Sequence, residues 1–447
     1  MLLVLLMFAC KPGVPVDTGD APPRVGDPEQ GYQTLLYGNY VGAGIPKDVW
    51  FDLVGTSPGN VLERQGQSAD LPPSFNLFEA PNGVEVVGGI TCLGCHSGYL
   101  NGQFIPGLAA HDSDFSENDS SLFELAGLAV DARYGADSAE SEAYWPLWRG
   151  ANAISPYMQT PFAGVNPAFS MERAAVSWRD PQTLEWQRDQ QFLPPTQVLA
   201  ADPPAWWLLK KKERLYWTGG GGGDQARLIS QISMVAVQDV AHYEQIEADM
   251  VDVLAWIREL EPPPFPQVVD DALVADGALV FEAHCRHCHG TYDEPQTYPS
   301  LVIPTSEVGT DPVYAAGFVE PTDFVDWLQD SWLAETEPYS GDFVPELGYI
   351  APPLDGVWAT APYLHNGSVP DLVSLLDSSQ RPVAWARNVG DSTYEMQRLG
   401  WPWQAAEPGP SNVYDTTVPG FGNGGHLYGD PLTAEERTAL LEFLKTL

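Results

Sequence analysis

One five-residue motif, Cys-x-x-Cys-His, occurs twice in the sequence, at residues 92–96 and 285–289. Two thiols spaced in this way can form thioethers with the two vinyl groups of a haem, and the histidine that follows is then held as the proximal ligand of the iron. The sequence therefore predicts two covalently bound haems c. Their attachment and proximal-ligand residues are Cys92, Cys95 and His96 for the first (haem 1), and Cys285, Cys288 and His289 for the second (haem 2).

Cysteine usage favours haem over zinc. The chain has 5 cysteines and 8 histidines, so chance would produce such a motif with a probability below about 0.001. The cysteine pairs of a zinc ribbon lie about 15–20 residues apart, whereas much of the chain separates Cys92 from Cys285. Because Cys10 is the only cysteine outside the motifs, no disulfide is expected.

The charge balance restricts the partners. The chain has 60 acidic and 21 basic residues, a formal net charge of −39. Nucleic acids and anionic membrane surfaces need a basic footprint, so neither is expected as a partner. The acidic residues either keep an exported protein soluble or dock a partner with a basic rim. Glycine (42) and proline (41) are abundant, which predicts long irregular loops.

The N-terminus has the character of an export signal. Residues 2–9 are apolar but too few to span a bilayer, and Cys10 follows Ala9 as in a bacterial lipoprotein cleavage site. We expect residues 1–10 to be a signal segment and the protein to be periplasmic or at the cell surface, touching the membrane only through a lipid on Cys10. Plain secretion is the alternative, because no basic residue precedes the run and bulky Phe8 stands near the cleavage site.

The rest of the chain divides into a flexible tether and two haem units. Residues 11–30 are rich in Pro, Gly and Asp and are typical of a tether. The first unit, 31–261, closes with an amphipathic stretch from 246 to 260. The three prolines at 262–264 stop that helix, and the second unit is 268–447.

The second unit has the pattern of a cytochrome c domain. An opening helix carries Gly277 and Phe281 and leads into the second motif, and a closing helix begins with the capping box Thr433-x-x-Glu436. In a cytochrome c fold these two helices cross. The residues before Cys92 look extended instead, so the first unit is an elaborated version. We therefore expect a mainly α protein with two cytochrome c-like haem domains and long irregular loops.

Two further segments have unusual composition. The run Gly219–Gly223 lacks the Gly-Lys-Ser/Thr of a phosphate loop, and we expect a flexible turn there. Residues 210–214 hold four basic side chains, which are either counter-ions for haem propionates or a surface cluster.

Five stretches carry a resemblance to a known family: GYQTLLYGNYVGAGIPKDVW (31–50), ITCLGCHSGYLNGQFIPGL (90–108), PPAWWLLKKKERLYW (203–217), APPLDGVWATAPYLHNGSVP (351–370), and GNGGHLYG with its closing helix (422–447). Over most of residues 31–447 the chain resembles the bacterial di-haem cytochrome c peroxidases, especially their rubber-oxygenase-like branch. The resemblance implies two haem domains with an interface, one haem that relays electrons and one that offers its iron to peroxide or dioxygen.

This resemblance suggests an exported oxidoreductase that reduces hydrogen peroxide at haem 1, with electrons relayed through haem 2 from a small redox donor protein. A dioxygen-using oxygenase of an apolar substrate is the second hypothesis, and a pure electron-transfer cytochrome without a substrate is the third. Calcium between the domains is expected from the family only, because no EF-hand-like loop is recognisable.

The sixth ligand decides whether an iron transfers electrons or does chemistry. For haem 2 we choose His426, which lies in the loop before the closing helix, where a cytochrome c sixth ligand usually lies; no methionine follows Met396. His365 is the alternative, although in the wider family this position is not the usual ligand, and the resemblance implies an inter-domain hydrogen bond for it.

For haem 1 the choice stays open. His111 lies near the position of the distal histidine of peroxidases, Met234 and His242 precede the closing helix of the first unit, and the fourth option is no protein ligand. The resemblance makes Trp206 and Trp207 candidates for lining the distal pocket or lying between the haems, with core packing as the alternative. Distal acids could be Glu117 or Glu124, unless both are solvated surface residues.

Overall fold

The computed structural model describes residues 14–16, 18–89, 91–117, 120–320 and 322–447. The expected signal segment 1–10, with Cys10, lies outside the described residues, as do residues 11–13 of the expected tether. Within the described part, no helix is both long and apolar enough to cross a membrane.

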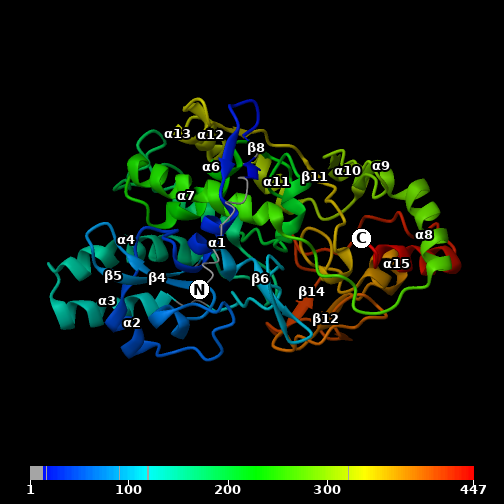
Figure 1. The fold of residues 1–447 in the computed structure, drawn as a ribbon, viewed down its shortest axis with the longest axis horizontal. Helices are drawn as coiled ribbons and strands as arrows, with labels where there is room; N and C mark the ends of the chain where they lie inside the picture. The colour runs from blue at the N-terminus through cyan, green and yellow to red at the C-terminus, as the bar shows by residue number, and fades with distance from the viewer. Residues whose placement is uncertain (1–13, 17, 90, 118–119, 321) are drawn as a thin grey trace, which may run out of the picture.

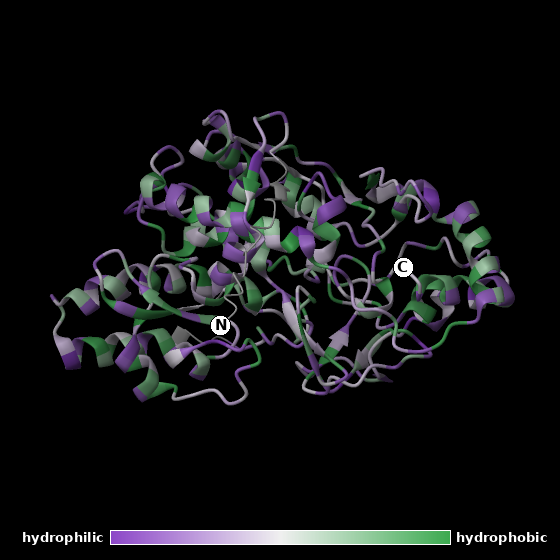
Figure 2. Cartoon of the chain, viewed as in Figure 1, coloured by the Kyte–Doolittle hydropathy of each residue, from purple (hydrophilic) through white to green (hydrophobic). Residues whose placement is uncertain are grey.

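Helices account for 39% of the described residues and every strand among them is short, which confirms the expectation of a mainly α fold. The early part of the chain occupies one side of the molecule and the C-terminal helices the other (Figure 1). Polar and apolar residues alternate along most helices, as expected when each helix buries one face (Figure 2).

The long helix α7 (Val240–Glu259) lies at the centre of the N-terminal side, where it contains most of the predicted amphipathic stretch. Helix α1 (Pro28–Tyr37) packs along it, and a Cβ on Gly31 would meet the Asp252 carbonyl oxygen at 1.9 Å. Strands β1 (Val14–Val16) and β2 (Arg24–Gly26) form a hairpin that also contacts α7.

Buried ion pairs fix this hairpin. Arg24 Nη1 lies 2.6 Å from Glu247 Oε1 and 3.3 Å from Asp224 Oδ1. The described residues of the expected tether are therefore packed against the protein rather than free of it.

The first haem motif lies between strands, as the extended residues before it predict. Strands β3 (Ile45–Pro46), β5 (Glu85–Gly89) and β4 (Phe75–Glu79) form an antiparallel sheet in that order. The 3₁₀ helix η2 (Cys92–Gly94) follows, and the hairpin of β6 (Ser97–Leu100) and β7 (Gln103–Pro106) comes next. The helices that flank this region are α2 (Lys47–Leu53), α3 (Ser120–Tyr134), α4 (Ala139–Ile154) and α5 (Ala168–Val176).

The C-terminal side has the crossing helices expected of a cytochrome c fold. Helix α8 (Asp271–His284) runs into α9 (Arg286–His289) and crosses α15 (Ala434–Leu444). A Cβ on Gly277 would meet the Ala439 carbonyl oxygen at 2.0 Å, and the rings of Phe281 and Phe443 are 5.2 Å apart. The capping box of Thr433 and Glu436 is present, which confirms that prediction.

Short elements connect the two sides. The helices are α6 (Gln225–Ile229), α10 (Thr305–Val308), α11 (Val313–Val319), α12 (Asp323–Gln329), α13 (Trp332–Glu335) and α14 (Leu372–Leu376). Strand β8 (Gly221–Gly223) pairs antiparallel with β10 (Gly341–Phe343). Strand β9 (Val302–Pro304) pairs in the same way with β11 (Gly348–Ile350). In a third sheet, β12 (Ala384–Ala386) lies between β13 (Gln404–Ala405) and β14 (Val413–Asp415).

The glycine run corrects one expectation. Residues 221–223 form strand β8 rather than a flexible turn. The physical reason is a close backbone approach, because a Cβ on Gly223 would meet the Ser340 carbonyl oxygen at 2.3 Å.

Two large hydrophobic cores each use residues from both sides of the proline linker. The first surrounds α7 and includes Tyr314 and Phe318, which follow the linker in sequence. The second surrounds the crossing of α8 and α15 and includes Leu100 and Trp207, which precede it. The boundary between the units at 261–268 stays a sequence prediction, and the packing ties the two parts together across it.

Candidate haem sites

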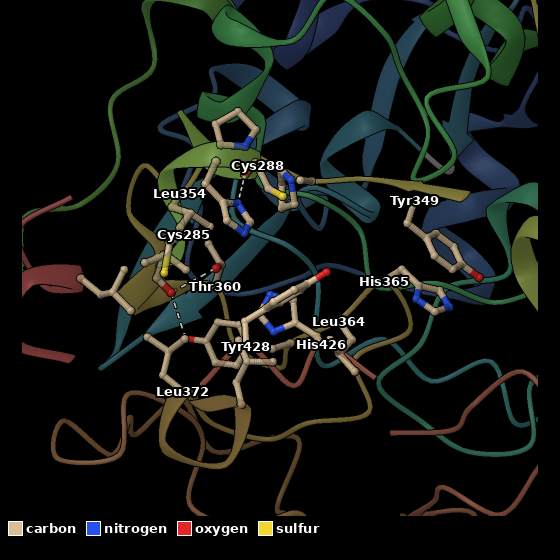
Figure 3. A pocket seen from close by; sticks show the side chains of 18 of the residues that line it. Cys285, Cys288, Tyr349, Leu354, Thr360, Leu364, His365, Leu372, His426 and Tyr428 are labelled. Atoms are coloured by element: carbon tan, nitrogen blue, oxygen red, sulfur yellow. Dashed lines mark hydrogen bonds between the residues drawn. The ribbon is translucent and has the colours of Figure 1, made fainter. Parts of the chain in front are cut away.

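The second motif opens onto a cavity of about 210 Å³ on the C-terminal side. This cavity is lined by Cys285, Cys288 and His289 and is called the haem 2 cavity below. Figure 3 shows the two cysteines in its wall. Helix α8 delivers the cysteines to its wall, and no described cysteine forms a disulfide. His289 Nδ1–H donates to the Pro352 carbonyl oxygen at 2.8 Å. That bond fixes the tautomer and leaves Nε2 as the nitrogen available to an iron.

His426 lies across the same cavity. Its ring centre is 6.3 Å from that of His289. An iron bound by two imidazole nitrogens at about 2.0 Å each separates the ring centres by roughly 6 Å, so the pair fits one haem iron. Burial lowers the pKa of His426 to about 3, which keeps its ring neutral, the form that binds metals.

The loop that carries His426 is held in a strained shape. His426 has φ +49°, a left-handed conformation that is uncommon outside glycine. Arg381 fixes this loop, since its guanidinium donates to the carbonyl oxygens of Asn423 and Gly425, both at 2.7 Å, and of His426 at 3.2 Å. The sequence reveals no such role for Arg381.

His365 also lines the haem 2 cavity but is oriented differently. Its ring stacks on Tyr349 with centres 3.9 Å apart and planes 16° apart, and Figure 3 shows the two side chains next to each other. No described residue hydrogen-bonds its buried Nε2. Its carbonyl oxygen accepts from Asp202 N–H at 2.8 Å. The hydrogen bond by which His365 joins the two sides of the molecule is thus made by its backbone and not by its ring.

The first motif opens onto a second cavity of about 270 Å³, the haem 1 cavity, lined by Cys95 and His96. His96 Nδ1–H donates to the Pro204 carbonyl oxygen at 3.1 Å, and the ring stacks on Trp206 at 5.1 Å. Asn166 Nδ2 lies 3.0 Å from Cys95 Sγ. Both proximal histidines are therefore held by a carbonyl from a Pro-Pro pair, a repeat that the sequence contains at 203–204 and 352–353.

None of the three side chains considered as a sixth ligand of haem 1 lines this cavity. The His111 ring packs on Trp401 at 3.9 Å, and its Nδ1–H donates to Ala109. Met234 is fully buried in the first core, and His242 lies against Gly42. Since His96 is the only histidine among the lining residues, and no methionine is among them, this arrangement favours the open option.

An acid that the sequence analysis missed lines the haem 1 cavity. Glu172 lies on α5, one turn after Phe169, and both face the cavity. Its buried Oε1 has no hydrogen-bond partner among the described residues, and burial raises the pKa of Glu172 to about 8. The proposed acids Glu117 and Glu124 are exposed and do not line it. The i, i+3 spacing of Phe169 and Glu172 is the only sequence signal for this pair.

One member of the basic cluster faces the haem 1 cavity. Lys210 pairs with Glu261 and Lys211 with Asp355, both at 2.7 Å. Lys212 is 7% exposed, lines the cavity and has no ion pair with a described residue. Burial lowers its pKa to about 8. An uncompensated buried cation fits a haem propionate, which would supply the missing charge.

A thin wall separates the two cavities. Residues 202–205 and Trp217 line both of them, and Trp217 Nε1–H donates to the Asp202 carbonyl oxygen at 2.7 Å. Of the tryptophans proposed from the sequence, Trp206 stacks on His96, whereas Trp207 is buried in the second core and donates to the Asp355 carbonyl oxygen. The tryptophan that lines both cavities is therefore Trp217.

These observations fit two haem groups. Each cavity has a motif histidine whose tautomer is fixed by a hydrogen bond. The haem 2 cavity also has a second imidazole at the right spacing, and the haem 1 cavity has a buried lysine without an ion pair to a described residue. Nothing comparable supports calcium, since the described residues contain no group of three or more His, Cys, Asp or Glu side chains that could hold a metal ion.

Comparison with known proteins matches one segment of the chain to a described family. Residues 348–386, which include Pro352 and His365, match the family described as RoxA-like, cytochrome c-like. Two relatives from Sinorhizobium fredii (strain NBRC 101917 / NGR234), "Uncharacterized protein y4iJ" and "Uncharacterized protein y4iM", are each 28% identical, over 251 and 236 residues. These matches cover 42% and 43% of this chain, and 41% and 53% of the relatives' own length. The chain thus contains a RoxA-like, cytochrome c-like domain, which implies haem c and supports the rubber-oxygenase-like branch of the resemblance.

Proposed function

We propose that the protein is an exported di-haem c oxidoreductase that reduces hydrogen peroxide at haem 1 with electrons that enter through haem 2. The observation that carries the proposal is the difference between the two cavities. The haem 2 cavity holds a second histidine, His426, at ligand spacing, which suits electron transfer. The haem 1 cavity has an unpartnered acid, Glu172, and no second histidine or methionine, which suits chemistry at the iron.

Three cavity residues have roles in this reaction. When bound, haem c supplies an iron that can take up an oxygen ligand and exchange electrons. His96 holds its place through the Pro204 carbonyl oxygen, and Trp217 occupies the wall through which electrons pass between the two sites. Glu172, protonated below pH of about 8, delivers a proton to the departing oxygen of the peroxide, and solvent supplies the second proton for the two waters formed.

The net charge and the N-terminal residues suit an exported protein that accepts electrons from a donor protein. A net charge of −39 favours a small donor protein with a basic surface. Residues 1–10 would direct export, and a lipid on Cys10 would keep the protein periplasmic or at the cell surface.

The variant Glu172→Gln tests the proton-transfer role. We expect peroxide turnover with a reduced cytochrome as donor to fall roughly 10²-fold or more, because the amide cannot deliver a proton. In the unchanged protein the rate should fall as pH rises through about 8, and this fall should be absent in the variant. Glu124→Gln, an exposed acid on α3, is the matched control. Turnover no faster than that of free haem would contradict the whole proposal.

A dioxygen-using oxygenase of an apolar substrate is the second candidate, because the matched family is RoxA-like and much of the haem 1 cavity wall is apolar, including Phe169, Leu215 and Leu228. Oxygen uptake in the presence of polyisoprene or smaller alkenes, with oxidised products, would favour it over peroxide reduction. The third hypothesis, a pure electron carrier, predicts that neither haem binds cyanide, carbon monoxide or peroxide.

A further inference from the structure

A row of three aromatic rings connects the two haem cavities by a route separate from Trp217. Tyr314 lines the haem 1 cavity, and His365 and Tyr349 line the haem 2 cavity. The ring centre of His365 is 6.1 Å from that of Tyr314 and 3.9 Å from that of Tyr349. All three side chains are at least 94% buried. The row places an oxidisable phenol at each end, one in each cavity.

The two tyrosines differ in what surrounds their hydroxyl groups. The Tyr349 hydroxyl donates to the Asp311 carbonyl oxygen at 2.5 Å and accepts from Ala315 N–H at 3.2 Å. The Tyr314 hydroxyl makes no hydrogen bond with a described residue. It shares its cavity with Glu172, and burial together with the charge of Glu172 raises the pKa of Tyr314.

This difference decides which phenol can be oxidised. A tyrosine that loses an electron becomes a strong acid, so its oxidation is favourable only where a nearby base takes the proton. A backbone carbonyl, the partner of Tyr349, is a very weak base. Glu172 is a base once it has given its proton to the departing oxygen of the peroxide, and it then lies in the same cavity as Tyr314.

We propose that Tyr314 is a one-electron donor to haem 1, used when haem 2 has no electron to give. This inference rests on the proposed function, which names hydrogen peroxide as the oxidant. Tyr314 gives one electron to the oxidised haem 1 and its phenolic proton to the Glu172 carboxylate, and becomes a neutral tyrosyl radical. An electron that later reaches haem 2 crosses Tyr349 and His365 to Tyr314, and Glu172 returns the proton. Tyr314 thereby stores one oxidising equivalent until a donor arrives.

The test is to mix the all-ferric holoprotein with hydrogen peroxide, freeze it within milliseconds and record its electron paramagnetic resonance spectrum, while the haem absorbance is followed in parallel. We expect a radical signal whose hyperfine pattern changes when the protein is produced with ring-deuterated tyrosine. Tyr314→Phe should abolish the signal. Tyr216→Phe is the matched control, because Tyr216 lines the same cavity near Glu172 but its hydroxyl accepts from Gln231, and this variant should keep the signal.

A second variant tests the route. In Tyr349→Phe the radical should form, but its decay after one electron is added per molecule should slow several-fold. Because the ring-deuterium experiment uses the unchanged chain, the inference remains testable if Tyr314→Phe fails to incorporate haem.

The possible results distinguish failure of the inference from failure of the proposed function. A haem absorbance change without a tyrosyl signal, or with a signal that survives in Tyr314→Phe or ignores the deuterium label, overturns the inference and leaves the proposed function standing. Absence of any absorbance change with peroxide overturns both.

Discussion

At the scale of single residues, the two proximal histidines are held in the same way, each with Nδ1–H on a proline carbonyl oxygen. Such a bond orients the ring and increases the basicity of the ligating nitrogen. What differs is the rest of each cavity, since the His426 ring lies 6.3 Å from that of His289, whereas Glu172 lines the cavity of His96. The proposed difference between the two haem sites therefore depends on one side chain in each cavity.

This difference predicts the effect of His426→Ala. Removal of the second imidazole should leave the iron of haem 2 with an open position, because no described methionine lines the haem 2 cavity and the His365 ring is stacked on Tyr349. A high-spin ferric signal and carbon monoxide binding at haem 2 are the expected results in electron paramagnetic resonance and optical spectra. His287→Ala, at an exposed position in the same motif, should leave both spectra unchanged. A haem 2 that stays low-spin in His426→Ala would contradict the assignment and direct attention to His365.

At the scale of the elements, the haem 2 cavity depends on the crossing of α8 and α15. Helix α8 ends at the motif cysteines, so any shift of this helix moves the haem attachment points. Gly277 permits the crossing, because the space for its Cβ is already taken by the Ala439 carbonyl oxygen and the Phe443 side chain. The contact between the two helices thus stabilises the fold and also positions the cysteines to which haem 2 would attach.

Gly277→Ala tests this contact. A methyl group 2.0 Å from the Ala439 carbonyl oxygen must push the helices apart, which should lower the free energy of unfolding by about 1–3 kcal/mol. Denaturant unfolding of the holoprotein, followed by circular dichroism, measures the change. Gly390→Ala is the control, since its Cβ would meet nothing closer than Asn388 Oδ1 at 3.7 Å. Equal stability of the two variants would mean that α8 and α15 do not pack this closely.

At the scale of the whole molecule, the two cores interleave across the proline linker, so the two haem cavities share one wall and keep a fixed relation. The charge of the chain is the second property at this scale. A net charge of −39 produces a long-range field, which would steer the proposed basic donor protein toward the surface.

Ionic strength tests the electrostatic part of donor docking. With a basic cytochrome as donor, kcat/KM should fall steeply when salt is raised from about 0.01 to 0.1 M, because the screening length drops from about 30 to 10 Å. A small uncharged donor should give a rate that hardly changes. A rate with the basic donor that is equally insensitive to salt would show that the acidic surface serves solubility alone.

Several features followed from the sequence by itself. The two haem motifs, the crossing helices with Gly277 and the capping box of Thr433 were predictable because they depend on spacing within a few residues or on one strong local signal. The choice of His426 for the haem 2 cavity was possible because few histidines and methionines compete for the position before the closing helix.

The tertiary structure alone decided what surrounds each haem cavity. Glu172 and Trp217 reach the haem 1 cavity from separate parts of the chain, and no local pattern distinguishes them from the many other acids and tryptophans. The basic cluster at 210–214 was visible in the sequence, but only the packing shows that Lys212 is its member that faces this cavity. His111 is close to His96 in sequence, yet its ring packs on Trp401, near the other end of the chain. Contacts between distant segments are set by the packing of whole elements, whereas the haem motifs need only the local chain.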